Sequence, residues 1–344
     1  MASKAIAGLN GFGRVGLHLL KYWLDRHSET HFIIRFINDD TLTIKDAYQI
    51  ICSDEHVHFN KYKVQLKDDT IVILEPDGSK HVIFYTNKEA IDIPWIGKPD
   101  IVFECSGKNT LAKDCAFYVT KRTKLAVISA TSWDADKTLV YGFNHATFNG
   151  TERVISYGSC TVNAYVPLAN YLNKKYGVLS SDVNVIHNIQ EYRLQENHTL
   201  NRKFCTLEKS GPQLLPFLNA NNFLVNYTIV PYSGVSMIDF RFKLGKPVST
   251  KDILQDLEET FSRGQLKYLY NFDETDIGPE AYNCSTYSVV FIKENLKVMD
   301  DNNVYFYGYF DNENSVNRYY DLVNYICIHE LFKENYQALD VVGI

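Results

Sequence analysis

Two groups of residues in this sequence have types and spacing that could do chemistry, and the first lies near the N-terminus. Glycines recur at Gly11, Gly13 and Gly16, the spacing that lets a backbone turn approach the pyrophosphate of a dinucleotide. Asp39 ends the next apolar stretch, where a carboxylate can accept hydrogen bonds from the adenosine ribose and repel a 2′-phosphate. The pattern predicts NAD rather than NADP; a glycine turn in an unrelated α/β domain is the alternative.

The second group is a cysteine and a histidine. Cys160, in Ser159-Cys160-Thr161-Val162-Asn163, precedes a helical pattern that runs to about Tyr176. A helix N-terminus and a nearby histidine lower the pKa of a thiol and supply the thiolate that attacks. His187 ends an apolar stretch and is the candidate base. Considered alone, Cys160 could also be a small apolar side chain of the core. His187 alone could also be a hydrogen-bonded histidine of a strand.

The elements that must position these groups follow from hydrophobic periodicity. We predict an α/β fold with a Rossmann-type doubly wound parallel sheet in residues 1–158, completed by a C-terminal helix in 314–344. Residues 159–313 are expected to form an α+β catalytic domain with a largely antiparallel sheet. Pro167 is expected to bend the helix after Cys160. The predicted strands are 4–10, 32–39, 81–85, 100–105, 124–129, 183–190, 226–231 and 235–243, with helices at 251–263 and near 314–334.

Composition narrows the class of protein. The chain has 344 residues, 45% of them hydrophobic, and a net charge of −6, so it suits about two domains and offers no basic surface for nucleic acid. Neither a signal peptide nor an apolar stretch long enough for a membrane span stands out, so we expect a cytoplasmic protein. Widely spaced cysteines without a C-x-x-C pair predict free thiols and no metal site. They are Cys52, Cys105, Cys115, Cys160, Cys205, Cys284 and Cys327.

The order of motifs resembles the glyceraldehyde-3-phosphate dehydrogenase family along nearly the whole chain. Four segments are similar to the cofactor domain of that family: Gly8-Leu9-Asn10-Gly11-Phe12-Gly13-Arg14-Val15-Gly16, Ile37-Asn38-Asp39, Glu104-Cys105-Ser106-Gly107 and Val127-Ile128-Ser129-Ala130. The nucleophile motif of the family resembles Ser159-Cys160-Thr161-Val162-Asn163, and the segment of its base resembles Ile186-His187. The segment that holds the nicotinamide carboxamide resembles Phe310-Asp311-Asn312-Glu313 with Asn317-Arg318.

The resemblance implies an NAD-dependent aldehyde dehydrogenase. Cys160 would form a thiohemiacetal and His187 would take the thiol proton; after hydride transfer, inorganic phosphate, or else water, would release the thioester. A homotetramer is implied too. The implied cofactor-binding residues are Asn10, Gly11, Phe12, Gly13, Arg14, Val15, Gly16, Asp39, Ser106, Gly107, Ser129 and Asn312, and the substrate-binding residues are Ser159, Thr161, Arg193, Ser210 and Gly211.

The sequence departs from the family at the substrate-phosphate site. Gln190 and Tyr192 stand where the family has threonines, and Ile229 replaces an arginine before Val230-Pro231. Arg193 is the candidate to replace the missing positive charge at the substrate-phosphate site, and Arg202, Lys203 and Lys209 follow it in the chain. The equal alternative is that these side chains are solvated charges of a loop. The interval after His187 is shorter than in the family, which puts the tetramer in doubt. Asn314-Ser315-Val316 replaces a Gly-Tyr pair of the family, which puts the packing near the nicotinamide in doubt.

Three functions remain open. The first is an active dehydrogenase for glyceraldehyde 3-phosphate, another phosphorylated sugar or an unphosphorylated aldehyde. The second is an NAD-binding regulatory protein with little turnover, favoured by the altered phosphate site. The third, an unrelated Rossmann-type reductase, requires the Cys160 and His187 motifs to be coincidental.

Overall fold

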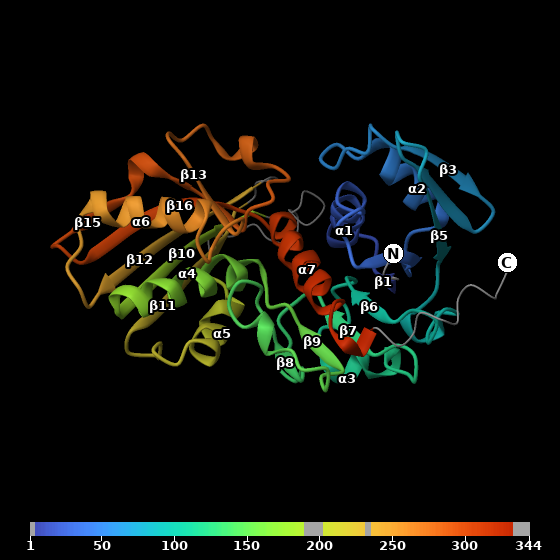
Figure 1. The fold of residues 1–344 in the computed structure, drawn as a ribbon, viewed down its shortest axis with the longest axis horizontal. Helices are drawn as coiled ribbons and strands as arrows, with labels where there is room; N and C mark the ends of the chain where they lie inside the picture. The colour runs from blue at the N-terminus through green and yellow to red at the C-terminus, as the bar shows by residue number, and fades with distance from the viewer. Residues whose placement is uncertain (1–3, 189–201, 231–234, 333–344) are drawn as a thin grey trace. The chain divides into compact units, whose positions relative to one another are not determined.

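Residues 4–188, 202–230 and 235–332 are described in this computed structural model (Figure 1). Contacts divide the chain into two compact units. Unit 1 comprises Met1–Leu139, His145–Gly158 and Tyr319–Ile344, and unit 2 comprises Val140–Asn144 and Ser159–Arg318. No helix within the described ranges is long and apolar enough to cross a membrane.

Unit 1 is built on a nine-stranded sheet in the order β3-β4-β5-β2-β1-β6-β7-β9-β8. The strand β1 pairs in parallel with both β2 and β6, so the winding direction of the sheet reverses beside β1. In doubly wound sheets, ligands bind at such a reversal, outside the carboxyl ends of the strands. The strands are β1 Ala5–Asn10, β2 Phe32–Asn38, β3 Lys63–Lys67, β4 Thr70–Leu74, β5 Lys80–Thr86, β6 Ile101–Glu104, β7 Leu125–Ile128, β8 Lys137–Thr138 and β9 Val154–Ser156.

One edge of this sheet differs from the predicted parallel arrangement. The strands β3 and β4 form an antiparallel hairpin, and β4 pairs antiparallel with β5. Helices α1 (Arg14–Asp25), α2 (Ile44–Ser53) and α3 (Ala112–Cys115) connect the strands of unit 1. The Rossmann-type fold predicted from the sequence is confirmed, with this antiparallel addition.

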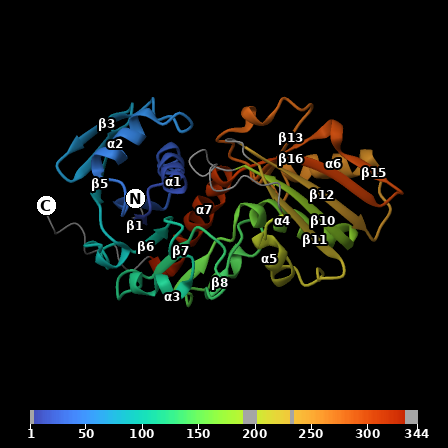
Figure 2. The same cartoon turned by 180° about the vertical axis from the view of Figure 1, so that it is seen from behind.

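Unit 2 contains a mixed sheet in the order β11-β10-β12-β16-β14-β13, with β15 paired to β16. Pairs β10–β11 and β13–β14 are parallel, whereas the other pairs are antiparallel, as predicted for most of this sheet. Figure 2 shows β10, β11 and β12 side by side. The elements are α4 Cys160–Tyr176, β10 Val178–His187, α5 Thr206–Leu214, β11 Phe223–Ile229, β12 Ser236–Leu244, α6 Thr250–Ser262, β13 Tyr270–Asp273, β14 Val289–Ile292, β15 Lys297–Met299, β16 Asn303–Phe310 and α7 Asn312–Ile326.

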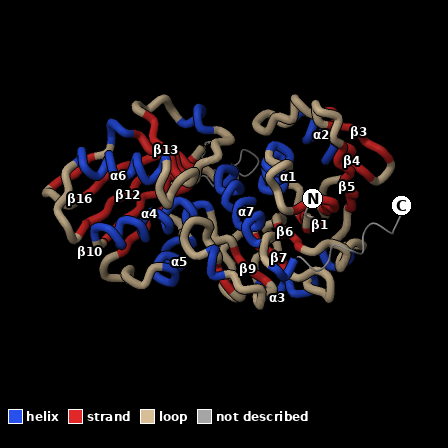
Figure 3. Tube along the Cα trace, in the orientation of Figure 1, coloured by secondary structure: helices blue, strands red, loops and turns tan. Residues whose placement is uncertain are grey.

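The core of unit 2 holds α4 and α6 against the sheet. Val162 and Leu172 of α4 and Leu257 of α6 are fully buried in one cluster with Phe240 of β12 and Phe306 of β16. Figure 3 shows both helices beside the strands of this sheet. Each such side chain contributes about 1.5–3 kcal/mol on burial, so the start of α4 is held on a rigid support.

Helix α4 continues through Pro167 to Tyr176. Because proline has no N–H, the carbonyl of Asn163, four residues earlier, receives no helical hydrogen bond from it. The hydroxyl of Tyr270 lies 3.3 Å from the Asn163 carbonyl oxygen and 2.9 Å from that of Ala164. A side chain from β13 therefore supplies the donor that the proline lacks.

Helix α7 contributes to both units, since its residues up to Arg318 belong to unit 2 and those from Tyr319 onward to unit 1. In unit 1, Tyr319 donates a hydrogen bond to the carbonyl of Val127 on β7, and its ring packs edge-on against Phe103 of β6. The C-terminal part of α7 thus fills part of the interior of unit 1.

Candidate active site

The turn between β1 and α1 is shaped by its glycines. Gly11 has φ +92°, and a Cβ there would lie 2.3 Å from the backbone of Ser106; a Cβ on Gly16 would lie 2.2 Å from the Gly11 carbonyl oxygen. Only glycine allows these close approaches. Gly13, the N-cap of α1, faces open space, with nothing within 4 Å of such a Cβ. The turn thus leaves room at the N-terminus of α1, where backbone N–H groups and the helix dipole favour an anion.

Asp39 is the buried carboxylate beside this turn. It accepts hydrogen bonds from the Phe12 backbone N–H at 2.7 Å and, through its other oxygen, from the N–H groups of Thr41 and Leu42 at 2.9 Å each. Burial alone would raise the pKa of Asp39, but these backbone hydrogen bonds outweigh it and hold the pKa below its usual range. Asp39 is therefore a fixed negative charge that also positions the glycine turn.

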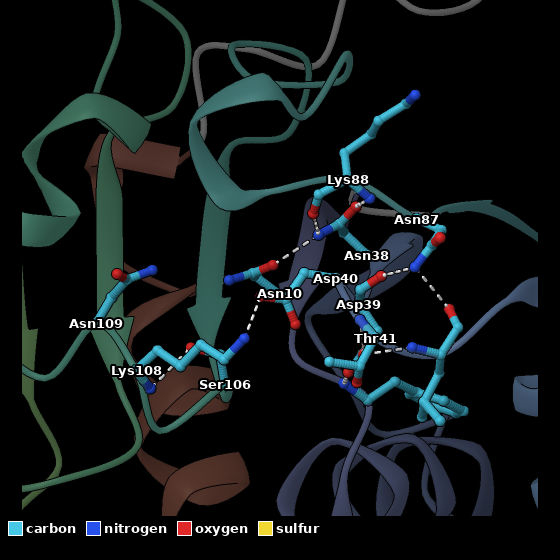
Figure 4. Close-up of polar contacts among 12 residues, drawn as sticks. Asn10, Asn38, Asp39, Asp40, Thr41, Asn87, Lys88, Ser106, Lys108 and Asn109 are labelled. Carbon is cyan, nitrogen blue, oxygen red and sulfur yellow. Dashed lines mark hydrogen bonds and ion pairs between the residues drawn. The ribbon is translucent and has the colours of Figure 1, made fainter.

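Polar side chains link the ends of the neighbouring strands (Figure 4). The Asn10 amide donates to Glu104 at 2.9 Å, and the Asn38 amide donates to the Asn10 side-chain oxygen at 2.9 Å. The Ser106 N–H donates to Glu104 at 2.8 Å, and Lys108 forms an ion pair with Asp40. These contacts fix the carboxyl ends of β1, β2 and β6, where a dinucleotide binds in this kind of sheet.

The remaining predicted cofactor residues of unit 1 lie around the same strand ends. Arg14 pairs with Asp54 at 2.6 Å, and Val15 lies in the first turn of α1. Gly107 has φ +69°, and the Ser129 N–H, just after β7, donates to the Glu104 carbonyl.

In unit 2 the structure brings Cys160 and His187 together. Cys160 is the first residue of α4 and His187 the last of β10. The Cys160 Sγ lies 3.7 Å from the His187 Nε2, and the His187 Nδ1 lies 2.7 Å from the Asn188 carbonyl oxygen. The Asn188 carbonyl can accept a hydrogen bond from an N–H on Nδ1, and in that tautomer the unprotonated Nε2 faces the thiol. Both side chains are buried.

The electrostatics of Cys160 differ from the expectation of a lowered pKa. Burial raises the pKa of this thiol well above its ordinary value, and the negative charges of Cys205, when ionised, and Asp311 add to the rise, whereas the backbone N–H of Thr161 opposes it. The raised pKa favours the protonated thiol, so a nucleophilic Cys160 would need a base to take its proton. His187 is placed to do so.

Three hydroxyl groups gather beside Cys160. The Ser159 Oγ lies 3.1 Å from the Thr161 Oγ1 and 3.0 Å from the Thr206 Oγ1. Sequence reasoning missed Thr206, because its contact with Ser159 joins the starts of two helices far apart in the chain. The predicted Ser210 instead donates to the Thr206 carbonyl within α5, and a Cβ on the neighbouring Gly211 would contact Phe223.

The part of the site that departs from the family is only partly described. Ile229 pairs with His187 across the parallel strands β10 and β11, so an apolar residue stands where the family has an arginine. Arg202 is engaged by Glu208 at 2.9 Å. Gln190, Tyr192 and Arg193 lie outside the described residues, as does the side chain of Asn312 at the start of α7.

The fold and these residues define a class: a protein with a dinucleotide-binding Rossmann unit and a second unit carrying a buried cysteine–histidine pair. Residues 6–112 match the family model described as glyceraldehyde 3-phosphate dehydrogenase, NAD binding domain. The chain is 26% identical to glyceraldehyde-3-phosphate dehydrogenase of Podospora anserina, over 94% of this chain and 98% of that protein. It is 28% identical to glyceraldehyde-3-phosphate dehydrogenase 1 of Bacillus cereus, over 93% and 97%.

The chain is therefore similar over nearly its whole length to members of the glyceraldehyde-3-phosphate dehydrogenase family, and residues 6–112 match the NAD-binding domain of that family. This similarity and NAD as the cofactor of the N-terminal unit agree with the predictions from the sequence.

Proposed function

We propose that this protein is an NAD-dependent aldehyde dehydrogenase that uses Cys160 as its nucleophile and His187 as its base. The single observation that carries the proposal is the buried pair itself, with Cys160 Sγ 3.7 Å from His187 Nε2 at the start of α4. The names of its relatives support glyceraldehyde 3-phosphate as the substrate and NAD as the hydride acceptor. Unit 1 then serves as the cofactor domain and unit 2 as the catalytic domain.

The reaction follows from the chemistry of the pair. His187 Nε2 takes the thiol proton as the sulfur adds to the aldehyde carbon, which gives a thiohemiacetal on Cys160. The backbone N–H of Cys160 and protonated His187 stabilise the oxyanion. The glycine turn and Asp39 would hold NAD, which would supply the hydride acceptor, and loss of hydride from the substrate carbon would leave a thioester of Cys160. Phosphate then attacks the thioester carbon, and the Cys160 sulfur leaves and regains its proton from His187.

The hydroxyls of Ser159, Thr161 and Thr206 are proposed to bind the attacking phosphate. The Ser159 Oγ lies 3.1 Å from the Thr161 Oγ1 and 3.0 Å from the Thr206 Oγ1, and hydroxyls can donate to phosphate oxygens. Arg193 is retained as the proposed partner of a phosphorylated substrate, because Ile229 supplies no charge. Homotetramer assembly remains a proposal made from the resemblance to the family.

The proposal is tested by following NADH formation with glyceraldehyde 3-phosphate and NAD, with and without inorganic phosphate. Turnover that needs phosphate and disappears in Cys160→Ser supports the proposal. Thr206→Val should raise the KM for phosphate while a single turnover of NADH stays intact, and Thr120→Val, in unit 1, is the matched control. Equal rates with and without phosphate would point to water as the acceptor.

The second candidate is an NAD-binding regulatory protein with little turnover, favoured by Ile229 beside His187. Alkylation separates the two. An activated Cys160 should react faster at neutral pH than the exposed Cys52, despite its burial, whereas unselective labelling together with NAD binding and no turnover would favour the regulatory role.

A further inference from the structure

A cluster of metal-ligand side chains lies in unit 1, away from the residues discussed so far. His27, Glu75 and His81 each offer one ligand atom, and the three atoms lie within 4.8 Å of one another. The His27 Nδ1 is 2.9 Å from the Glu75 Oε1, and the His81 Nε2 contacts the same oxygen. No metal site was predicted from the sequence, because these three residues have no metal-motif spacing in the chain.

Three different segments hold the ligands, and each segment is constrained. Glu75 follows β4 and His81 lies on β5; since Ile73 pairs with His81, Glu75 lies two residues further on the same face of the hairpin. A turn closed by the Glu75 N–H on the Ser79 carbonyl joins the two strands. His27 follows the end of α1, and its carbonyl accepts a hydrogen bond from Lys4.

The donor set and its surroundings match one class of ion. Two imidazole nitrogens and one carboxylate oxygen are ligands of Zn²⁺, which binds them at about 2.0–2.2 Å, so that ligand atoms stand about 3.3 Å apart. The side chains are mostly buried, with exposed fractions of 27% for His27, 10% for Glu75 and 14% for His81. The His81 ring also packs edge-on against the buried Trp23 at 4.9 Å between centroids.

Space for a further ligand lies beside the cluster. A pocket of about 190 Å³ is lined by His27 and His81 together with Trp23, Lys4, Arg35 and Lys80. Three protein ligands with one position open to solvent is a common zinc arrangement, and the basic side chains of this pocket favour a fourth ligand that is water or a small anion.

We propose that His27, Glu75 and His81 form a Zn²⁺ site with one exchangeable ligand. The site lies at the amino ends of β2 and β5, whereas Asp39 and the glycine turn lie at the carboxyl ends. It is therefore separate from the dinucleotide site within the same unit, and it does not depend on the proposed dehydrogenase activity. Bound zinc joins the end of α1 to the β4–β5 hairpin, so it stabilises unit 1.

The test measures Zn²⁺ and Co²⁺ binding to the full chain in the Cys160→Ser background, which removes the proposed nucleophilic thiol as a competing ligand. We expect one bound ion per chain, a raised thermal midpoint and Co²⁺ absorption without the thiolate charge-transfer band. Glu75→Gln and His81→Asn should each weaken binding by at least about tenfold. His56→Gln, which changes an exposed histidine outside the cluster, should bind like the parent.

The result that overturns the proposal is equal zinc affinity in the parent, Glu75→Gln and His81→Asn, or no stoichiometric binding by the parent. Glu75→Gln keeps the size of the side chain, so its far-ultraviolet circular dichroism separates a lost ligand from a lost fold.

Discussion

At the scale of single residues, the proposed reaction depends on how the buried thiol of Cys160 loses its proton. Burial raises the pKa of this thiol, so the proposal needs a base beside it. The proposed base is His187, whose Nε2 lies 3.7 Å from the sulfur and would accept the proton as the bond to sulfur forms.

Replacing His187 by Asn should therefore slow alkylation of Cys160 at neutral pH by about 10²–10⁴-fold. The difference from the parent should narrow as the pH rises, because hydroxide then removes the thiol proton without the histidine. Alkylation rates read by mass spectrometry across the pH range test this. A constant ratio at every pH would mean that His187 acts only through packing.

A second prediction concerns how Asp39 contributes to stability and to its pH dependence. Its folded pKa lies below the usual value because backbone N–H groups hold the carboxylate, so the stabilisation is present above the unfolded pKa of about 3.9 and is lost as the pH falls through the folded pKa. Asp39→Asn should lower the free energy of unfolding by about 1–3 kcal/mol at neutral pH and flatten the acid dependence. Urea unfolding at several pH values measures both effects.

Asp40→Asn is the matched control for Asp39→Asn, since Asp40 pairs with the exposed Lys108. It should change stability by less than about 1 kcal/mol, and NAD affinity should fall more in Asp39→Asn. Equal losses of stability in the two variants would mean that the backbone contacts of Asp39 add nothing.

At the scale of elements, two glycines of the β1–α1 turn are needed for different reasons: Gly16 for the packing of the turn, and Gly13 for the binding of a ligand. A Cβ on Gly16 would collide with the Gly11 carbonyl, but a Cβ on Gly13 would meet open space. Gly16→Ala should thus destabilise unit 1, whereas Gly13→Ala should keep its stability and lose at least about tenfold in NAD affinity, because the methyl group occupies the room for the pyrophosphate. Calorimetric titration with NAD and thermal unfolding measure the two effects in both variants. Unchanged NAD affinity in Gly13→Ala would mean that the pyrophosphate does not bind at this turn.

Helix α4 supplies another prediction for an element. Tyr270→Phe removes the hydroxyl that donates beside Pro167 and should cost about 1–3 kcal/mol in the free energy of unfolding. In the Pro167→Ala background, the restored N–H can reach the Asn163 carbonyl, so the same substitution should cost less. A double-mutant cycle from urea unfolding measures the difference, and strictly additive values would refute the compensation.

Elements with strong periodicity could be predicted from the sequence, whereas others could not. Helix α4 begins at Cys160, as predicted, because Ser159 is a good N-cap whose hydroxyl accepts from the Val162 N–H. The hairpin β3–β4 was missed because its turn carries Asp68, at φ 48°, in place of the glycine that marks such turns. Thr206 could not be assigned to Ser159 because only the packing of α4 and α5 brings them together.

At the scale of the whole molecule, several thiols are sealed inside the fold. Cys105 and Cys327 share with Cys160 a pKa raised by burial. A raised folded pKa stabilises the fold fully below the unfolded pKa of about 8.5, and this contribution is lost as the pH rises above it.

The free energy of unfolding should consequently fall at alkaline pH, by up to about 1.4 kcal/mol per thiol per pH unit. Denaturation by urea under reducing conditions measures the slope between neutral and alkaline pH. Cys327→Ala should give a shallower slope, whereas Cys52→Ala, at an exposed position, should leave it unchanged. An identical slope in both variants would assign the alkaline loss to other groups.

The sharing of α7 between the units has a consequence for synthesis. Unit 1 begins near the first residue, yet its interior includes Tyr319, which bonds to Val127 and packs on Phe103. The ribosome must therefore translate all of unit 2 before the last part of unit 1 exists. The half that emerges first is the half completed last, and during that interval its sheet lacks the contacts that Tyr319 of α7 makes with Val127 and Phe103.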